Sequence, residues 1–146
     1  DLNGSALAGA RIKLDKGQGC AVVCHFGTGA GATVSVSLDQ HDAATAGSTA
    51  SLNISRNYYV KSGADTSFTK TEIRSDESLS DTADISASVG AAEGIAIFDV
   101  RPEDLDVNNS YAFASVNIAD STTAKITSVE YHVYDIKSGF GYEQVF

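Results

Sequence analysis

The chain has 146 residues and carries 19 acidic against 10 basic side chains, which gives a formal net charge of −9. A surface of that sign repels the phosphate backbone of nucleic acids, and no basic cluster interrupts it, so we expect no nucleic-acid partner. No run approaches the roughly 20 apolar residues that a membrane helix needs, and 42% hydrophobic residues in a chain of this length predict a single folded domain over residues 1–146 without a membrane span.

The first part of the chain predicts an N-terminal arm. Residues 1–10 are small and polar, and Leu2 and Leu7 are the large apolar side chains among them. We expect this segment to be an arm or a first edge strand, continued by residues 11–14.

The next segment predicts a β-hairpin. Residues 20–26 form a short run that is apolar on both faces of an extended chain, and residues 32–38 alternate Val and Leu with Ser and Thr. Gly-rich residues 27–31 lie between them. Strand, glycine turn and returning strand are the expected pattern of a hairpin.

The middle of the chain gives weaker signals. Polar, alanine-rich residues 39–50 predict a loop, with one helical turn over residues 41–46 as an option. Tyr58 and Tyr59 lie in a predicted strand over residues 52–61, which a turn at residues 62–65 ends. Two further weak strands are expected at residues 67–74 and 82–89.

The strongest block is residues 94–120. Two runs rich in β-branched and aromatic residues, 95–100 and 111–119, flank a polar connection. Pro102 presets a turn or a single helical turn there, and Asn108-Asn109 tolerates positive φ.

The longest alternating pattern lies near the C-terminus. Over residues 124–137 one face of an extended chain carries Thr127, Val129, Tyr131 and Val133, which predicts a strand. Residues 138–146 form a tail that contains glycines and aromatic side chains. Together the elements predict an all-β fold, an antiparallel β-sandwich or jelly-roll-like domain with about eight to ten strands.

The two cysteines are not expected to form a disulfide. Cys20 and Cys24 lie on the same face of a predicted strand, about 13 Å apart at ~3.3 Å per residue, which is beyond disulfide reach. We expect both to be reduced and buried, as small apolar side chains are.

No catalytic or cofactor-binding motif emerges from the chain. His25, His41 and His132 have no metal-ligand spacing, and no G-x-S-x-G nucleophile motif occurs. The acidic clusters around residues 99–106 and 76–84 match no calcium loop, although a structural calcium ion stays an alternative. We therefore expect no enzyme activity and no cofactor, with a small enzyme as a minority alternative.

The order of these features resembles the head decoration, capsid-stabilising and minor capsid proteins of tailed bacteriophages. The resemblance rests on the strand at residues 20–26 with its Gly-rich turn, on Arg56-Asn57-Tyr58-Tyr59, and on the segment from Phe98 to Tyr111 followed by Val116-Asn117-Ile118-Ala119-Asp120. A strand at residues 129–134 completes it. The resemblance covers most of the chain, and its motifs are structural.

The resemblance implies a non-enzymatic structural protein on the outer face of a capsid. Its implied partners are the major capsid protein and further copies of itself, with a trimer favoured, and its implied location is the virion exterior after assembly in the host cytoplasm. We expect the two ends of the chain to make the partner contacts, with ordinary packing of the terminal aromatic side chains as the alternative. The expected partner-binding residues are Leu2, Leu7, Arg11, Phe140, Tyr142 and Phe146.

Two other classes of structural protein stay open. The chain begins at Asp1 and contains no methionine, so a processed extracellular β-sandwich, such as an adhesin or a carbohydrate-binding module, is one alternative. A tail or neck subunit of a phage, assembling as a ring or a helical stack, is the other.

Overall fold

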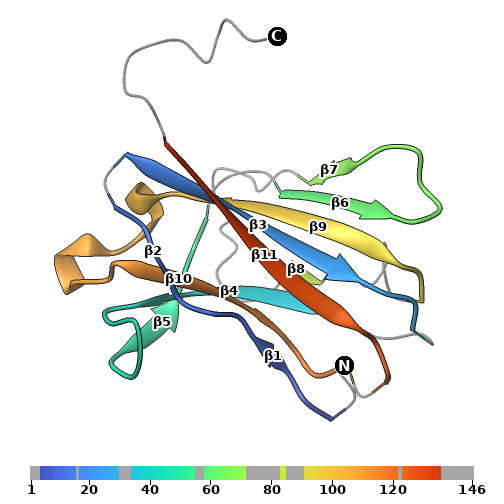
Figure 1. Ribbon diagram of the computed structural model, residues 1–146, viewed down its shortest axis with the longest axis horizontal. Helices are drawn as coiled ribbons and strands as arrows, with labels where there is room; N and C mark the ends of the chain where they lie inside the picture. The colour runs from blue at the N-terminus through green and yellow to red at the C-terminus, as the bar shows by residue number, and fades with distance from the viewer. Residues whose placement is uncertain are drawn as a thin grey trace, which may run out of the picture.

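The computed structural model shows two antiparallel β-sheets packed face to face (Figure 1). It describes residues 4–15, 17–29, 34–54, 58–71, 83–84, 91–121 and 123–135. The predicted all-β sandwich is confirmed. Eight of the described strands have three or more residues, within the expected number, and three two-residue strands add to them.

The first sheet has five strands in the order β11-β3-β9-β6-β7. Every neighbouring pair in it is antiparallel. Its longest strands, β3 and β11, pair without interruption over nine residues, from Thr127 opposite Phe26 to Asp135 opposite Gln18. The five strands are β3 (Gln18–Phe26), β6 (Tyr58–Ser62), β7 (Thr69–Thr71), β9 (Gly94–Val100) and β11 (Thr127–Asp135).

The second sheet has six strands and follows the order β1-β10-β4-β5, with β2 also on β10 and β8 also on β4. The two-residue strands β1 and β2 pair with the same edge of β10, one after the other. The predicted arm is thus a broken edge strand. The six strands are β1 (Leu7–Ala8), β2 (Ile12–Lys13), β4 (Ser35–His41), β5 (Thr49–Ser51), β8 (Ala83–Asp84) and β10 (Phe113–Ile118).

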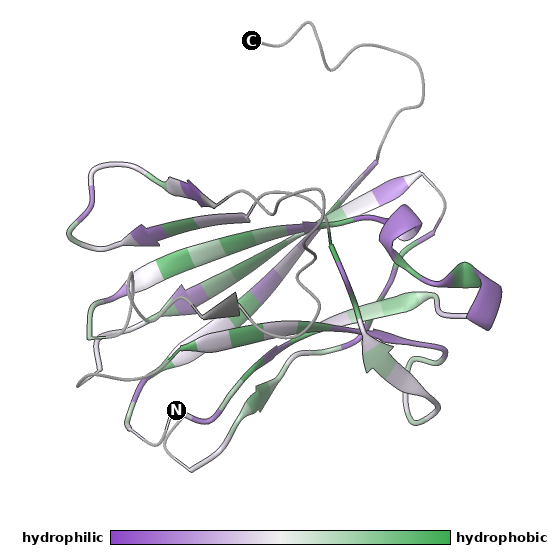
Figure 2. Cartoon of the chain, turned by 180° about the vertical axis from the view of Figure 1, so that it is seen from behind, coloured by the Kyte–Doolittle hydropathy of each residue, from purple (hydrophilic) through white to green (hydrophobic). Residues whose placement is uncertain are grey.

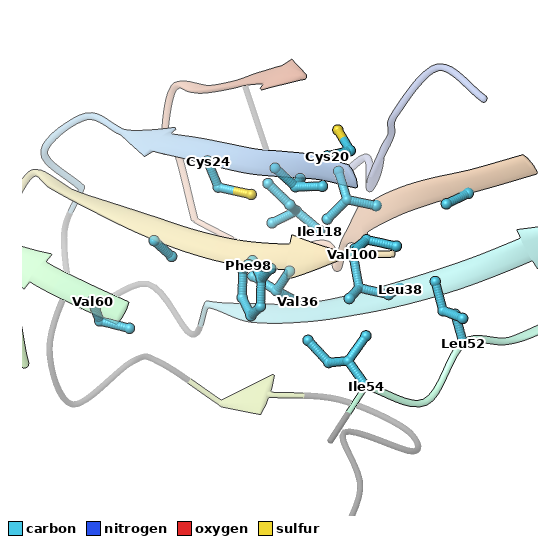
Figure 3. Packing of buried hydrophobic residues seen from close by; sticks show 14 of the residues in the cluster. Cys20, Cys24, Val36, Leu38, Leu52, Ile54, Val60, Phe98, Val100 and Ile118 are labelled. Atoms are coloured by element: carbon cyan, nitrogen blue, oxygen red, sulfur yellow. The ribbon is translucent and has the colours of Figure 1, made fainter. Parts of the chain in front are cut away.

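The hydrophobic core lies between the two sheets. Alternate residues of β3, β4 and β9 are buried, as the period of two requires, and Figure 3 shows Phe98 and Val100 of β9 facing the space shared with Val36 and Leu38 of β4. The Tyr58 ring stacks on Phe98 with centroids 5.3 Å apart. Burying one such large apolar side chain contributes about 1.5–3 kcal/mol, so this layer is the main source of stability.

The predicted hairpin of residues 20–26 and 32–38 is wrong. β3 belongs to the five-stranded sheet and β4 to the six-stranded sheet, so the chain crosses the sandwich between them. β3 pairs instead with β9 and β11, which lie far along the chain. Both strands place an apolar face toward the common core. Two strands can do so equally well in facing sheets as in the same sheet, so the apolar pattern does not show whether they pair.

Three local expectations also need correction. The helical turn at residues 41–46 does not form, because β4 extends to His41 and a series of bends follows. The strand expected from residue 52 begins at Tyr58, while Leu52 and Ile54 are buried outside any strand. His41, expected in a loop, is the last residue of β4.

The connection between β9 and β10 contains two short 3-10 helices, η1 (Pro102–Asp104) and η2 (Val107–Asn109). The expected turn at Pro102 is confirmed. The positive φ, however, is at Ser110 (67°) and not at the two asparagines. The Asp106 side chain accepts hydrogen bonds from the backbone N–H and the side-chain amide of Asn109, which keeps Asn109 in the 3-10 helix. The left-handed conformation therefore falls on the following residue, Ser110.

A buried lysine links several connections at one end of the sandwich by hydrogen bonds. Lys125 is 1% exposed, and its ammonium group donates hydrogen bonds of 2.7 Å to the backbone oxygens of Gly27 and Ala92. These three residues come from three different connections, which places the cation where several carbonyl groups converge.

In the part of the chain that the structure describes, no helix has the length and apolarity to cross a bilayer.

Candidate binding surface

The outer face of the five-stranded sheet carries an apolar band, although it has no described layer on top of it. Val23 of β3 lies opposite Ile97 of β9, and Ile97 lies opposite Tyr59 of β6, so three apolar side chains form one row across the sheet. Tyr59 is 41% exposed, and the other two are half-buried. We call this row, together with its neighbours, the outer stripe: Ala21, Val23, Tyr59, Ile95 and Ile97.

The signal for the outer stripe is already present in the sequence. Residues 20–26 are apolar on both faces, whereas a half-exposed strand of an antiparallel sheet should alternate. The same holds for β9, where Ile95 and Ile97 alternate with the buried Ala96 and Phe98. Figure 2 shows the hydrophobic residues along the central strands, in contrast to the largely hydrophilic 3-10 segment.

Charged side chains flank the outer stripe at both sides. Glu130 of β11 lies opposite Val23, and Lys70 of β7 lies opposite Tyr59. Glu130 is 3.2 Å from His132 Nε2 and 3.7 Å from His25 Nε2. An apolar centre with a polar rim is the usual anatomy of a protein–protein contact surface.

A hollow of about 270 Å³ lies at one end of the outer stripe. His25, Lys61 and Glu93 supply its polar groups, and Ile95 lies beside them. The Lys61 ammonium also lies 6.0 Å from the centre of the Phe68 ring. The volume is at the lower limit of small-molecule sites, so the hollow suits a side chain of a partner better than a cofactor.

A second hollow, of about 400 Å³, lies beside the 3-10 helices. Leu14, Leu105 and Tyr111 line it, together with Val107, which is 64% exposed. Its lining is mostly apolar, so it could accommodate an apolar side chain but has few groups that could act as catalysts or ligands.

A polar cluster continues the rim of the outer stripe toward the start of β3. The Tyr134 hydroxyl donates a hydrogen bond to Asp99, which also accepts one from Arg101 Nε at 3.0 Å. Burial, followed by the hydrogen bond to Asp99, raises the pKa of Tyr134 to about 12. The phenol therefore stays protonated and acts as a donor, and the cluster holds the ends of β9 and β11 together.

The cysteines are free and fully buried, as expected. Burial raises the pKa of the Cys24 thiol to about 12, and burial together with the nearby Asp99 charge raises that of Cys20 to about 11. Because the thiolate is the nucleophile, neither thiol is activated near neutral pH.

One serine–histidine pair has the spacing of a catalytic dyad but the surroundings of a structural one. His41 Nε2 lies 2.8 Å from Ser115 Oγ, and His41 Nδ1 lies 2.9 Å from Thr49 Oγ1. Both members of the pair are buried, and a hydroxyl takes the place of the carboxylate that would stabilise an imidazolium. Burial, together with the Arg11 charge, lowers the pKa of His41. The pair, together with Thr49, links β4, β5 and β10.

Two of the sequence-predicted contact residues lie in the described part of the chain. Leu7 lies opposite Ile118 and packs against the core, and the Arg11 guanidinium donates hydrogen bonds to the backbone oxygens of Ala43, at 3.0 Å, and Ala46. Arg11 thus holds the loop after β4 within its own chain. The other predicted contact residues, Leu2, Phe140, Tyr142 and Phe146, lie outside the described residues.

Among the described residues, no three His, Cys, Asp or Glu side chains are grouped to hold a metal ion. The carboxylates around the 3-10 helices bind backbone and side-chain donors instead, as Asp104 does with the Arg101 N–H at 2.8 Å.

Comparison of the chain with protein-family models, with curated proteins and with solved structures found no match in any of the three.

Proposed function

We propose that this chain is a non-enzymatic structural protein that binds a protein lattice, the outer face of a tailed-bacteriophage capsid, and stabilises it. The observation that carries the proposal is the outer stripe, an apolar row with charged ends on a sheet face that no described layer covers. Apolar side chains on a sheet face cost solubility unless a partner covers them. The phage capsid as the partner comes from the family resemblance of the sequence.

The physical role follows from mass action. A protein that binds the assembled lattice, and binds separate subunits less well, adds its binding free energy to the stability of the lattice. Each contact can be modest because a lattice presents many copies of the same site. The net charge of −9 supports a position on the outside of a nucleic-acid container, away from the packaged phosphates.

The test is co-sedimentation with empty, expanded shells of the major capsid protein from the suspected phage. We expect binding by the unaltered chain and a higher melting temperature of the shells. The double variant Ile97→Thr, Tyr59→Thr should lose at least tenfold in affinity, because each side chain gives up apolar area while keeping strand propensity. Val107→Thr, an exposed apolar residue away from the sheet, is the matched control and should bind normally.

Two results would overturn the proposal. One is absence of binding to expanded shells by the unaltered, folded chain. The other is equal binding by the double variant and the control, which would move the contact away from the outer stripe.

One observation favours a second candidate, the extracellular binding module. Tyr59 and Phe68 are exposed aromatic side chains beside Lys61 and the hollow at His25, and aromatic faces next to polar groups suit sugar rings. This candidate predicts glycan binding that Tyr59→Thr abolishes, with no affinity for capsid shells. A tail or neck subunit would instead form rings or stacks without shells.

A further inference from the structure

Strand β11 forms a long edge of the five-stranded sheet. It has nine residues, pairs with β3 on one side, and has no strand along its other side among the described residues. Edge strands are usually protected by proline, lysine, a bulge or short length. β11 contains no proline and no lysine, its register with β3 is continuous, and Val133 is 49% exposed. Such an edge is a template for a further strand.

A hydrogen bond at the start of β11 shows which of its residues point their backbone N–H and C=O groups toward β3 and which point them away. The Gly27 N–H donates to the Ile126 oxygen at 2.8 Å, and these two residues continue the register that places Thr127 opposite Phe26. In an antiparallel ladder, opposed residues alternate between hydrogen-bonded and non-hydrogen-bonded pairs. Ser128, Glu130, His132 and Tyr134 therefore direct their backbone groups toward β3. The residues that direct them away from β3 include Thr127, Val129, Tyr131 and Val133.

We propose that two copies of this chain associate by antiparallel pairing of β11 with β11 about a two-fold axis at Tyr131. In that register Val129 lies opposite Val133 of the second copy, and both have outward-directed backbone groups, so they form hydrogen-bonded pairs. Glu130 lies opposite His132 of the second copy, and the reverse pair repeats it across the axis. Residues 128–134 of the strand are paired in this register.

Charge selects this register over its neighbours. A shift that moves the axis to position 130 places Glu130 opposite its own copy, and a shift to position 132 does the same with His132. These positions are non-hydrogen-bonded pairs, in which the Cα atoms are only about 4.5 Å apart. Two carboxylates repel there, two imidazoles bring no acidic partner together, and a carboxylate opposite an imidazole is favoured.

The pairing goes beyond the proposed function and does not depend on it. It joins two five-stranded sheets into one continuous sheet, so that the outer stripes of both copies lie on the same face. A binding surface of that kind has two equal sites related by a two-fold axis. The closed state is a dimer, in contrast to the trimer that the family resemblance implies.

A cross-linking experiment tests the register directly. In the proposed dimer Glu130→Cys on one chain faces His132→Cys on the other, at a Cα separation that suits a disulfide. Mild oxidation of the two variants mixed together should give a covalent dimer, whereas each variant alone should not. A mixture of Ser128→Cys with His132→Cys is the matched control and should stay uncross-linked. The native thiols are fully buried and should not interfere.

Native mass and a charge exchange complete the test. Light scattering of the unaltered chain over a range of concentrations should show a mass that rises from one chain to two. Glu130→Lys should raise the dimer dissociation constant roughly tenfold or more, since both cross-strand pairs lose their carboxylate. Glu130→Lys combined with His132→Glu should restore it, because each pair again holds one carboxylate and one basic group.

Several outcomes would overturn the inference. They are a single-chain mass at every concentration, cross-linking of Glu130→Cys with itself, cross-linking of the control mixture as fast as of the test mixture, and a charge exchange that restores nothing. Circular dichroism and thermal melting of each variant show that it is folded. Failure of capsid binding would leave all of these results unchanged.

Discussion

The Tyr131 hydroxyl oxygen accepts a hydrogen bond of 3.2 Å from the backbone N–H of Val116. Tyr131 belongs to β11 in one sheet and Val116 to β10 in the other, so the bond spans the sandwich. It is needed because the edge of β10 is covered by two short strands, β1 and β2, with a break between them. The Tyr131 oxygen is the acceptor for the Val116 N–H, which has no strand acceptor at the break between β1 and β2.

Tyr131→Phe should therefore lower the free energy of unfolding by about 1–3 kcal/mol, because it leaves a buried N–H group without a partner. Burial also raises the pKa of the Tyr131 phenol, so it is a neutral hydroxyl at physiological pH. Urea unfolding of the purified chain measures the loss. Tyr59→Phe, which removes an exposed hydroxyl from the outer face, should change stability by less than about 0.5 kcal/mol. Equal effects of the two substitutions would contradict a bridging role.

Gly9 lies in the break between β1 and β2, and the same tyrosine fills the space beside it. A Cβ at this position would lie 2.2 Å from Tyr131 Oη and 2.8 Å from the Val116 oxygen. Gly9→Ala should cost about 1–3 kcal/mol, as overpacking does. Gly27→Ala is the control, because its Cβ would meet Ile126 at an ordinary 3.5 Å. In a Tyr131→Phe background Gly9→Ala should cost less, which a double-mutant cycle would detect. Additive costs would show that the two positions are not coupled.

Lys125→Met should be strongly destabilising. Methionine has a similar length but cannot donate, so the Gly27 and Ala92 oxygens lose their bonds to the ammonium group. We expect a loss of roughly 2–4 kcal/mol in the free energy of unfolding. Lys13→Met, at a lysine whose side chain is 58% exposed, should stay within about 0.5 kcal/mol of the unaltered chain. A loss no greater than that of the control would mean that the buried cation contributes little.

The buried thiols should make the fold sensitive to alkaline pH. The pKa of Cys24 is raised from 9.0 to about 12 by burial, so the folded state holds its proton where the unfolded state releases it. The corresponding stability is complete below pH 9.0 and is lost as the pH rises toward about 12, at up to about 1.4 kcal/mol per pH unit for one thiol. Cys24→Ala should lower stability near neutral pH but flatten this alkaline slope. Parallel slopes for the two proteins in urea unfolding would contradict the assignment.

The outer stripe was not predicted as a contact surface from the sequence, although the pattern behind it was visible there. Strand segments that are apolar on both faces, such as residues 20–26, imply a second covered face, and the structure places Val23 on it beside Ile97. Arg11 could not be assigned from sequence because its carbonyl partners, Ala43 and Ala46, are more than thirty positions away. The His41–Ser115 pair was likewise invisible, since no spacing links the two residues.

The sequence by itself determined the fold class and the positions of the long strands in the second half of the chain. Alternation of apolar and polar side chains is a local property, so it identified β9, β10 and β11 without knowledge of their neighbours. The tertiary structure alone decided which strands are neighbours, as the failure of the hairpin between β3 and β4 shows. A strand needs a covered face and paired backbone groups, and any strand of suitable pattern can supply both, so the partner is chosen by the packing of the whole chain.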